Sequence, residues 1–370
     1  MRNNDQAAMR LAHRLARRGL GQTWPNPAVG AVLVESGPTG EIVGRGWTQK
    51  GGRPHAERIA LEQACDRAEG ATLYVTLEPC AHHGQTPPCS EAIVEAGVSR
   101  VVYALEDPDP RVRGRGRDAL KRAGVGVEKL SGVSDVNWPA HGHVLRQTQS
   151  RPFVQLKLAV GSDGRLKPGD GAPVWVTGET ARAHGHLLRA QADAILVGHN
   201  TIVADDPSLT CRLPGLAGRS PIRVVLDTGL NLPISSRIVT SAKDTQVLIV
   251  CGNGVDQERV RPFERSGAQV LQAPANGQGV DLMHALAMLA KRGITRLMVE
   301  GGPTVARTCL SAGVVDEAVI FTGAKPAGIK GLMPFVDTGL ERLTESDEFM
   351  LKHERMLGAD RMAVYRRRSA

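Results

Sequence analysis

The sequence predicts two consecutive α/β domains in one chain. Its 370 residues exceed the usual size of a single domain. Both halves alternate short runs of apolar residues with segments of helical periodicity, which is the pattern of a sheet with helices on its faces. Between the halves, residues 131–152 carry no strong strand signal and end in Arg151-Pro152. We therefore expect domains at 1–147 and 148–370.

The first domain is expected to hold a mixed sheet. The segment 5–19 forms an amphipathic helix that ends at Gly19, and the segments 29–34 and 42–47 form a hairpin across the turn at 37–40. Further helices are expected at 55–68, 89–96 and 117–123, and further strands at 71–77, 100–104 and 125–129.

The second domain begins a new α/β pattern at Phe153. Strands are expected at 153–159, 174–177, 193–198, 222–227, 246–250, 294–299 and 315–321. Helices are expected at 179–190, 257–265, 281–291 and 304–312.

The composition argues against several classes of protein. No run of eighteen apolar residues exists and the first residues lack the apolar core of a signal peptide, so we expect no membrane span and a cytoplasmic location. Six cysteines are too few for a disulfide framework in a chain of this length. The net charge of +8 would suit nucleic acid, but aromatic residues make up only 3% and the basic residues are scattered. We therefore expect no nucleic-acid partner.

The segment from His55 to Cys89 is the most informative part of the chain. It has a Glu two residues after His55, a Pro-Cys pair ending at Cys80, and a second Cys at position 89. One imidazole and two thiolates hold Zn²⁺ in zinc deaminases, and two helix N-termini, at His55 and Cys89, would favour the thiolates. The metal ionises a water molecule while a glutamate moves protons. The sequence thus predicts zinc ligands His55, Cys80 and Cys89 and a catalytic Glu57.

Other interpretations of this segment are open. A structural zinc site would take His82 or His83 as a fourth ligand, but would leave Glu57 without a purpose. A base deaminase acting on RNA is the rival enzyme, and a zinc-stabilised module without catalysis is the rival outside enzymes. Most zinc deaminases have two residues between their cysteines, whereas eight separate Cys80 from Cys89, which speaks against an RNA deaminase. The intact ligands and Glu57 speak against an inactive module.

The second half carries a Glu-Gly-Gly-Pro-Thr segment from Glu300 to Thr304 between an expected strand and an expected helix. Glycines let the backbone approach a ligand closely, and a helix N-terminus offers free N–H groups to an anion such as a cofactor phosphate. The alternative is a tight connection without a ligand. Neither a Rossmann fingerprint nor a P-loop is present in the sequence.

These motifs together resemble the RibD family of riboflavin biosynthesis proteins, which couples a pyrimidine deaminase to a reductase. The resemblance rests on Pro-Asn-Pro-x-Val-Gly at 25–30, on the Cys80–Cys89 segment, on Asp-Pro-x-Pro-x-Val-x-Gly-x-Gly at 107–116, and on matching motifs through the second half. It covers about residues 5–365. It implies a cytidine-deaminase-like three-layer α/β/α domain followed by a dihydrofolate-reductase-like α/β domain.

The resemblance also implies the ligands and the residues that bind them. The substrate would be a phosphorylated pyrimidine and the cofactors Zn²⁺ and NADPH, and we expect a homo-oligomer, a dimer. The pyrimidine of the deaminase would lie near Asn26, His82, His83, Asp107 and Asp109. NADPH would lie near Val160, Trp175, Thr201, Asp205, Thr228, Gly302, Pro303 and Thr304. The reductase substrate would lie near Pro173, Arg189, Leu209, Arg212 and Glu300.

Simpler roles are open for some of these residues. Asn26 suits a turn between two prolines, Arg189 the surface of a helix, and Asp205 the cap of a turn. If the two arginines do bind substrate, Arg189 and Arg212 would hold the sugar phosphate bidentately.

Two positions depart from the pattern of the family. Thr48 stands where relatives commonly have a pocket histidine, and Gln85 stands where they commonly have Lys or Arg before Thr-Pro-Pro-Cys. A neutral Gln85 cannot supply the charge for a phosphate contact. We expect Arg53 or the arginines at 111–117 to supply it instead.

Overall fold

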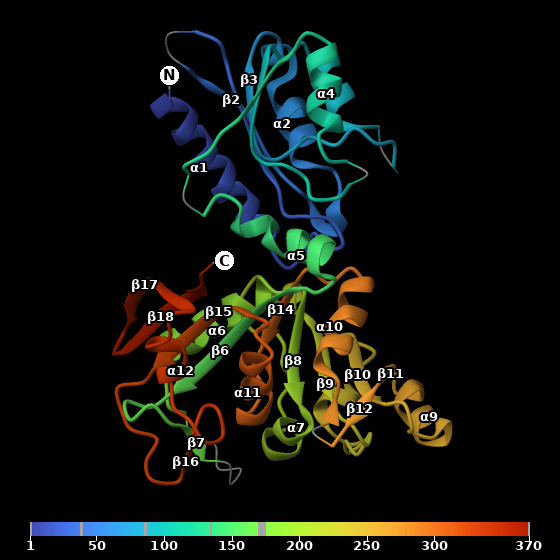
Figure 1. Cartoon of the computed structure of the whole chain (residues 1–370), viewed down its shortest axis with the longest axis vertical. Helices are drawn as coiled ribbons and strands as arrows, with labels where there is room; N and C mark the ends of the chain where they lie inside the picture. The colour runs from blue at the N-terminus through green and yellow to red at the C-terminus, as the bar shows by residue number, and fades with distance from the viewer. Residues whose placement is uncertain are drawn as a thin grey trace. The chain divides into compact units, whose positions relative to one another are not determined.

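The computed structural model describes residues 2–37, 40–84, 87–110, 112–133, 135–168, 175–277 and 279–368. The chain divides into two compact units, Met1–Arg151 and Pro152–Ala370 (Figure 1). The boundary expected between residues 147 and 148 falls inside α5 (His141–Gln149), a helix that the sequence pattern does not predict. This helix belongs to the first unit, where its Arg146 donates from Nη1 to the carbonyl of Pro25 at 3.1 Å.

The first unit is built on a five-stranded mixed sheet in the order β2-β1-β3-β4-β5. β1 is antiparallel to both of its neighbours, whereas β3, β4 and β5 are parallel. All five strands predicted for this unit are present, with ends shifted by no more than a residue. Their bounds are β1 (Gly30–Val34), β2 (Ile42–Trp47), β3 (Thr72–Leu77), β4 (Arg100–Leu105) and β5 (Gly126–Lys129).

Helices cover both faces of this sheet. They are α1 (Arg2–Gly19), α2 (Ala56–Ala64), α3 (Cys89–Glu95) and α4 (Arg115–Arg122). The buried side chains of α2, α3 and α4 share one core with β1, β3 and β4, and those of α1 share a second core with the opposite face of the same strands. The predicted three-layer α/β/α arrangement is confirmed.

A glycine sets the close approach of α2 to the sheet. A Cβ at Gly46 of β2 would lie 2.1 Å from the carbonyl oxygen of Ala56, so no larger residue fits. The N-terminus of α2, which carries His55, is therefore held directly against the sheet.

The second unit contains a nine-stranded sheet in the order β11-β10-β9-β8-β14-β6-β15-β18-β17. The strands from β11 to β15 are parallel, and β18 and β17 are antiparallel to their neighbours. Their bounds are β6 (Phe153–Val160), β8 (Ala194–Gly198), β9 (Ile222–Leu226), β10 (Val247–Gly252), β11 (Gln269–Ala273), β14 (Arg296–Val299), β15 (Val315–Thr322), β17 (Phe349–Leu357) and β18 (Asp360–Arg367).

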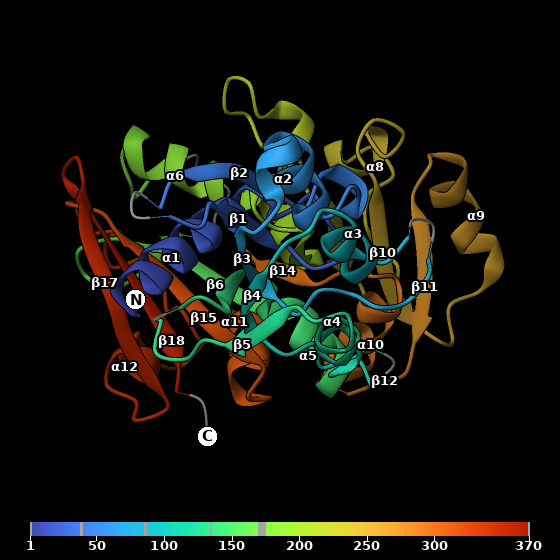
Figure 2. The same cartoon turned by 90° about the horizontal axis from the view of Figure 1, so that it is seen from above.

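Six helices of the described residues lie between the first and last parallel strands along the chain. They are α6 (Glu179–Ala190), α7 (His199–Asp205), α8 (Arg237–Thr240), α9 (Gln257–Arg265), α10 (Leu282–Lys291) and α11 (Pro303–Ser311). Helices α6 and α8 lie on one face, and α10 and α11 lie on the other (Figure 2). The short elements are β7 (Leu166–Pro168), β12 (Ala275–Asn276), β13 (Gly279–Val280), β16 (Gly331–Leu332) and α12 (Glu341–Thr344).

One strand predicted for this unit is wrong over its described part. Residues 175–177 are not in a strand, and residue 174 lies outside the described residues. The side chain of Trp175 is 70% exposed and lies against the guanidinium of Arg182, so the apolar pattern that suggested a strand belongs to an exposed loop.

In the described residues, every helix is too short or too polar to cross a membrane.

Candidate active sites

Three side chains from different elements converge in the first unit. His55 caps the N-terminus of α2, Cys80 follows the end of β3, and Cys89 is the first residue of α3. The Nδ1 atom of His55 lies 3.3 Å from the Sγ of Cys89 and 3.7 Å from the Sγ of Cys80. Among the described residues, only this group of His, Cys, Asp and Glu side chains brings three ligand atoms within 4.8 Å of one another.

The distances and donor types fit a tetrahedral zinc ion. With Zn–S bonds of about 2.3 Å and a Zn–N bond of about 2.0 Å, tetrahedral ligand atoms stand about 3.5–3.8 Å apart. His82 and His83 are exposed, and His83 pairs with Glu91 at 3.1 Å. Over the described part of the chain the group has three protein ligands, which matches an open catalytic zinc site better than a closed structural one.

The two thiols differ in protonation before metal binds. The pKa of Cys80 is lowered to about 4, chiefly by the hydrogen bond from the Cys89 thiol and then by His55 and the backbone N–H of Cys89. The pKa of Cys89 is raised well above its usual value by that same hydrogen bond and by burial. Zinc binds thiolates, so metal binding displaces the proton of Cys89.

Glu57 lies at the same place, in the first turn of α2. Its carboxyl group is buried, and burial raises its pKa while the neighbouring charge of His55 opposes the rise. A hydrogen bond links its side chain to that of Cys89. The structure thus brings the predicted catalytic residue into contact with the predicted metal ligands.

Asn26 holds the segment that leads into His55. Its Nδ2 donates to the carbonyl of Gly52 at 2.9 Å, and Gly52 has a φ of +83° that favours glycine. Asn26 is therefore more than a turn former. Thr48 is buried, and its hydroxyl accepts the N–H of Val29 at 3.0 Å, so this side chain serves the hairpin.

Asp107 and Asp109 form a buried turn after β4. The Oδ1 of Asp107 accepts the N–H of Asp109 at 2.9 Å and lies 3.2 Å from the Nε2 of His143. Because β4 is the parallel neighbour of β3, this turn and Cys80 leave the same edge of the sheet. Asp107 therefore holds the turn together and contacts His143, in addition to the substrate role expected for it.

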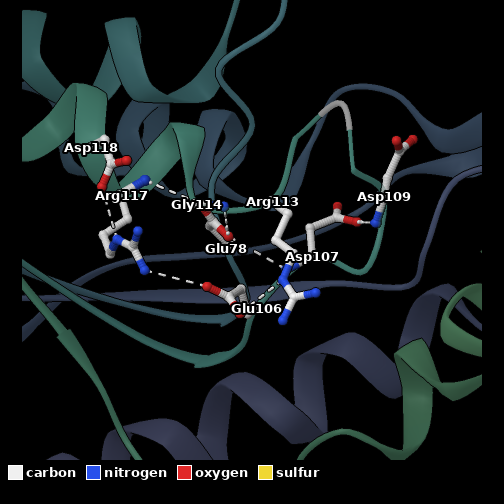
Figure 3. Close-up of polar contacts among 8 residues, drawn as sticks. All are labelled: Glu78, Glu106, Asp107, Asp109, Arg113, Gly114, Arg117 and Asp118. Carbon is white, nitrogen blue, oxygen red and sulfur yellow. Dashed lines mark hydrogen bonds and ion pairs between the residues drawn. The ribbon is translucent and has the colours of Figure 1, made fainter.

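Two arginines of the following segment are paired with acidic residues. Arg113 and Arg117 each lie 3.3 Å from a carboxylate oxygen of Glu106, and Arg117 also pairs with Asp118 at 2.9 Å (Figure 3). Arg111 lies outside the described residues.

Arg53 lies against the segment between the two cysteine ligands. A Cβ at Gly84 would stand 3.3 Å from the Nη2 of Arg53, which places the guanidinium beside that segment. The pKa of His55 is raised mainly by its hydrogen bond with Cys80, and the positive charge of Arg53 acts against this rise. Gln85 itself lies outside the described residues.

In the second unit, residues predicted to hold NADPH follow the carboxyl ends of parallel strands. Val160 ends β6, Gly302 follows β14, Thr201 lies in α7 after β8, and Thr228 follows β9. These strands stand side by side in the order β6-β14-β8-β9, so the four residues lie along one edge of the sheet. The N–H of Gly302 donates to the Oγ1 of Thr201 at 3.1 Å. Open α/β sheets bind their ligands at this edge.

The same edge continues into a cavity of about 690 Å³ beyond Thr228. Its lining includes Gly252 at the end of β10, Pro274 after β11, and Arg259 on α9. Within the row, after β14, Pro303 and Thr304 begin α11, whose first free N–H groups suit a phosphate. The edge therefore has a place for a phosphate and a cavity of the size that small ligands occupy.

A buried ion cluster surrounds Glu300. Arg189 donates from Nε and Nη2 to its two carboxylate oxygens at 2.7 and 2.9 Å, and the Nζ of Lys157 lies 3.5 Å away. Burial raises the pKa of Glu300, but the charges of Arg189 and Lys157 outweigh it and lower the pKa to about 2. The Nη1 of Arg189 donates to the carbonyl of Thr210 at 3.1 Å. Arg189 is thus no surface residue. The two guanidinium nitrogens with which it was expected to hold a phosphate donate to Glu300 instead.

The remaining residues predicted to bind the reductase ligands are Arg212, Leu209, Asp205 and Pro173. Arg212 is adjacent to the ion cluster, since its backbone N–H donates to the Nδ1 of His186 on α6, and Leu209 is buried with a φ of +54°. Asp205 forms an ion pair with Lys167, so it does more than cap a turn. Pro173 lies outside the described residues.

Lys157 is the site residue that sequence reasoning missed. It lies in β6, the strand next to β14, whose end carries Glu300. A lysine in a mostly apolar strand was the available signal, because such a residue needs a partner for its charge.

Comparison with known proteins identifies both units. Residues 2–105 match the model of the cytidine and deoxycytidylate deaminase zinc-binding region, and residues 152–356 match the model of the RibD C-terminal domain. The zinc-binding match contains all three residues of the metal cluster.

Relatives and solved structures match over nearly the whole chain. The riboflavin biosynthesis protein RibD of Aquifex aeolicus is 38% identical over 99% of both chains, and that of Escherichia coli is 39% identical over 96% of this chain and 97% of its own. The structure of Acinetobacter baumannii RibD is similar with a TM-score of 0.85, at 33% identity over 99% of both chains. A Thermotoga maritima diaminohydroxyphosphoribosylaminopyrimidine deaminase/5-amino-6-(5-phosphoribosylamino)uracil reductase has a TM-score of 0.82, at 31% identity over 98% of both chains. The chain therefore belongs to the RibD family of riboflavin biosynthesis proteins, and it joins a zinc-dependent deaminase to an NADPH-dependent reductase.

Proposed function

We propose that this chain catalyses two successive steps on one phosphorylated pyrimidine. The first is hydrolytic deamination of 2,5-diamino-6-ribosylamino-4(3H)-pyrimidinone 5′-phosphate. The second is NADPH-dependent reduction of the ribosyl side chain, which gives 5-amino-6-ribitylaminouracil 5′-phosphate. The observation that carries this proposal is the match over 98% of the chain to the Thermotoga maritima enzyme, whose description contains both reactions.

In the deamination, the protein supplies the ligands and the proton transfer. Bound zinc supplies a water molecule that ionises near neutral pH. His55, Cys80 and Cys89 would hold the metal. Glu57 accepts one proton of the water and delivers it to the ring nitrogen beside the amino-bearing carbon. It then takes the second proton, from the hydroxyl group that now stands on that carbon, and gives it to the departing amino group. Water and the amino-pyrimidine thus become ammonia and a ring carbonyl.

In the reduction, the protein holds two partners along one sheet edge. Bound NADPH supplies a hydride, which C1′ of the ring-opened imine accepts. The first N–H groups of α11 suit the cofactor phosphates, and the cavity beyond Thr228 suits its adenosine end. The imine nitrogen must gain a proton as C1′ gains the hydride. Lys157 carries three donors and is held by Glu300, so it suits this proton transfer.

The proposed function can be tested with the purified chain and this pyrimidine. Without NADPH, we expect one equivalent of ammonia and a deaminated ribosyl product by mass spectrometry. With NADPH, we expect oxidation of one equivalent of cofactor and a ribityl product two hydrogens heavier. Neither product forming in zinc-loaded protein would contradict the proposal.

We further propose that Arg53 holds the 5′-phosphate of the deaminase substrate. Its guanidinium lies beside the segment between the cysteine ligands, next to the metal cluster. Removal of one charge-assisted contact costs about 1.5–3 kcal/mol. We expect Arg53→Gln to raise KM about 10- to 100-fold with little change in kcat, and to remove the preference for the phosphorylated substrate over its nucleoside.

A second substitution makes this test specific. Gln85→Lys in the Arg53→Gln background restores a cation next to Gly84 and is expected to lower KM again. Arg45→Gln, at an exposed residue of β2, is the matched control and should leave KM unchanged. Equal discrimination against the nucleoside in wild type and Arg53→Gln would show that another group binds the phosphate.

The homodimer and the cytoplasmic location expected from the sequence stay predictions. Light scattering of the purified chain measures the first, and fractionation of cells that express it measures the second.

A further inference from the structure

A buried carboxylate near the metal cluster accepts hydrogen bonds from three backbone N–H groups of the segment that runs from the end of β4 into the first turn of α4. Glu78 is only 3% exposed. Its Oε2 accepts the N–H of Asp107 at 3.4 Å and that of Gly114 at 3.1 Å, and its Oε1 accepts the N–H of Arg117 at 3.1 Å (Figure 3). The acceptors come from the end of β3 and the donors from the segment that runs from β4 into α4.

The backbone around Glu78 is held on two sides. Its own N–H donates to the carbonyl of Leu105 at the end of β4, at 2.8 Å. On the other side, a Cβ at Gly116 would stand 1.8 Å from the carbonyl oxygen of Pro79, so the first turn of α4 packs directly on the residue before Cys80. The Glu78-Pro79-Cys80 segment is therefore fixed between β4 and α4.

The loop that Glu78 binds carries the Asp107–Asp109 turn. The N–H of Asp107 donates to Glu78, and the side chain of Asp107 in turn accepts the N–H of Asp109 and faces His143. A chain of contacts thus runs from the residue two positions before a metal ligand to the turn expected to bind the pyrimidine. In the described residues, the hydrogen bonds of the Glu78 carboxylate come from backbone N–H groups and not from the metal ligands or the side chains of that turn.

We propose that Glu78 is a positioning residue of the deaminase, which fixes the distance between Cys80 and the Asp107–Asp109 turn. This inference rests on the proposed function. A carboxylate is required because all three neighbours are donors and an ionised carboxylate only accepts. A glutamine of the same shape turns its NH₂ group towards at least one of these N–H groups, whichever way the amide is oriented. A lost partner for a buried donor shifts the loop and leaves the zinc ligands in place.

The first test is Glu78→Gln in the full chain. We expect wild-type zinc content, wild-type NADPH oxidation with the deaminated intermediate, and KM for the diaminopyrimidine raised about 10-fold or more, with kcat changed less than about 3-fold. Glu106→Gln is the matched control, since Glu106 lies one residue from Asp107 but binds the side chains of Arg113 and Arg117. This control should keep the wild-type KM.

Glu78→Asp provides a second variant in case the glutamine variant does not fold. It keeps an acceptor-only group on a side chain one methylene shorter, so its KM should lie between those of the wild type and Glu78→Gln. Unchanged KM in a folded variant would overturn the proposal. Loss of zinc from both variants would also overturn it, because Glu78 would then be structural. Failure of the proposed function is distinct, since in that case the wild-type chain itself does not release ammonia from the pyrimidine.

Discussion

Glu57→Gln is expected to abolish ammonia release while zinc stays bound. The substitution keeps the shape of a buried side chain but removes the group that accepts the proton of the water. A positioned acid–base group contributes about 10²–10⁴-fold to a rate, and we expect a loss in this range. The measurement is ammonia release from the diaminopyrimidine together with zinc content per chain.

The control for this variant lies on the same helix. Glu62 is an exposed residue of α2, and Glu62→Gln should retain wild-type deamination. NADPH oxidation with the deaminated intermediate should be normal in both variants, since the reductase residues lie in the other unit. Sustained deamination by Glu57→Gln with full zinc would show that another group moves the protons.

Glu300→Gln is expected to remove the second activity and to spare the first. The substitution leaves Arg189 and Lys157 as two buried cations without the carboxylate between them. Breaking a buried ion pair by removing one partner costs about 3–5 kcal/mol, which corresponds to about 10²–10³-fold or more in NADPH oxidation if the cost falls on the reactive arrangement. The measurement is the rate of NADPH oxidation with the deaminated intermediate.

Ammonia release is the measurement that could contradict this prediction. It should be normal in Glu300→Gln, and both activities should be normal in Glu179→Gln, an exposed residue in the first turn of α6. If ammonia release and NADPH oxidation fell together, the assignment of the two reactions to separate units would be wrong.

Much of this structure could be predicted from runs of apolar residues and from the spacing of motifs in the sequence. β1 and β3 of the first unit and β8 and β10 of the second are almost continuous buried runs, so their positions follow from the sequence alone. The metal cluster was also predictable, because residue types with one shared chemistry occur at a known spacing. The segment His55–Cys89 carries that information within itself.

Contacts between distant segments were not predictable in this way. β17 is mostly exposed and has no alternating apolar pattern, so its place at the sheet edge depends on pairing with β18. Glu300 and Arg189 are 111 positions apart, and no local pattern indicates that they meet. Glu78 is a similar case, since its partners become visible only when the loop after β4 is in place.

The order of segments along the reductase edge has a consequence for synthesis of the chain on the ribosome. Val160 ends the first strand of that unit. The next residue along the edge is Gly302, which is made much later, and Thr201 and Thr228 follow it in space. The edge is therefore incomplete until most of the second unit has been made. The residues of the metal cluster lie within 55–89, in a unit whose contacts close by residue 151. Because N-terminal domains fold first during translation, the deaminase site can form and take up zinc while the reductase is still being synthesised.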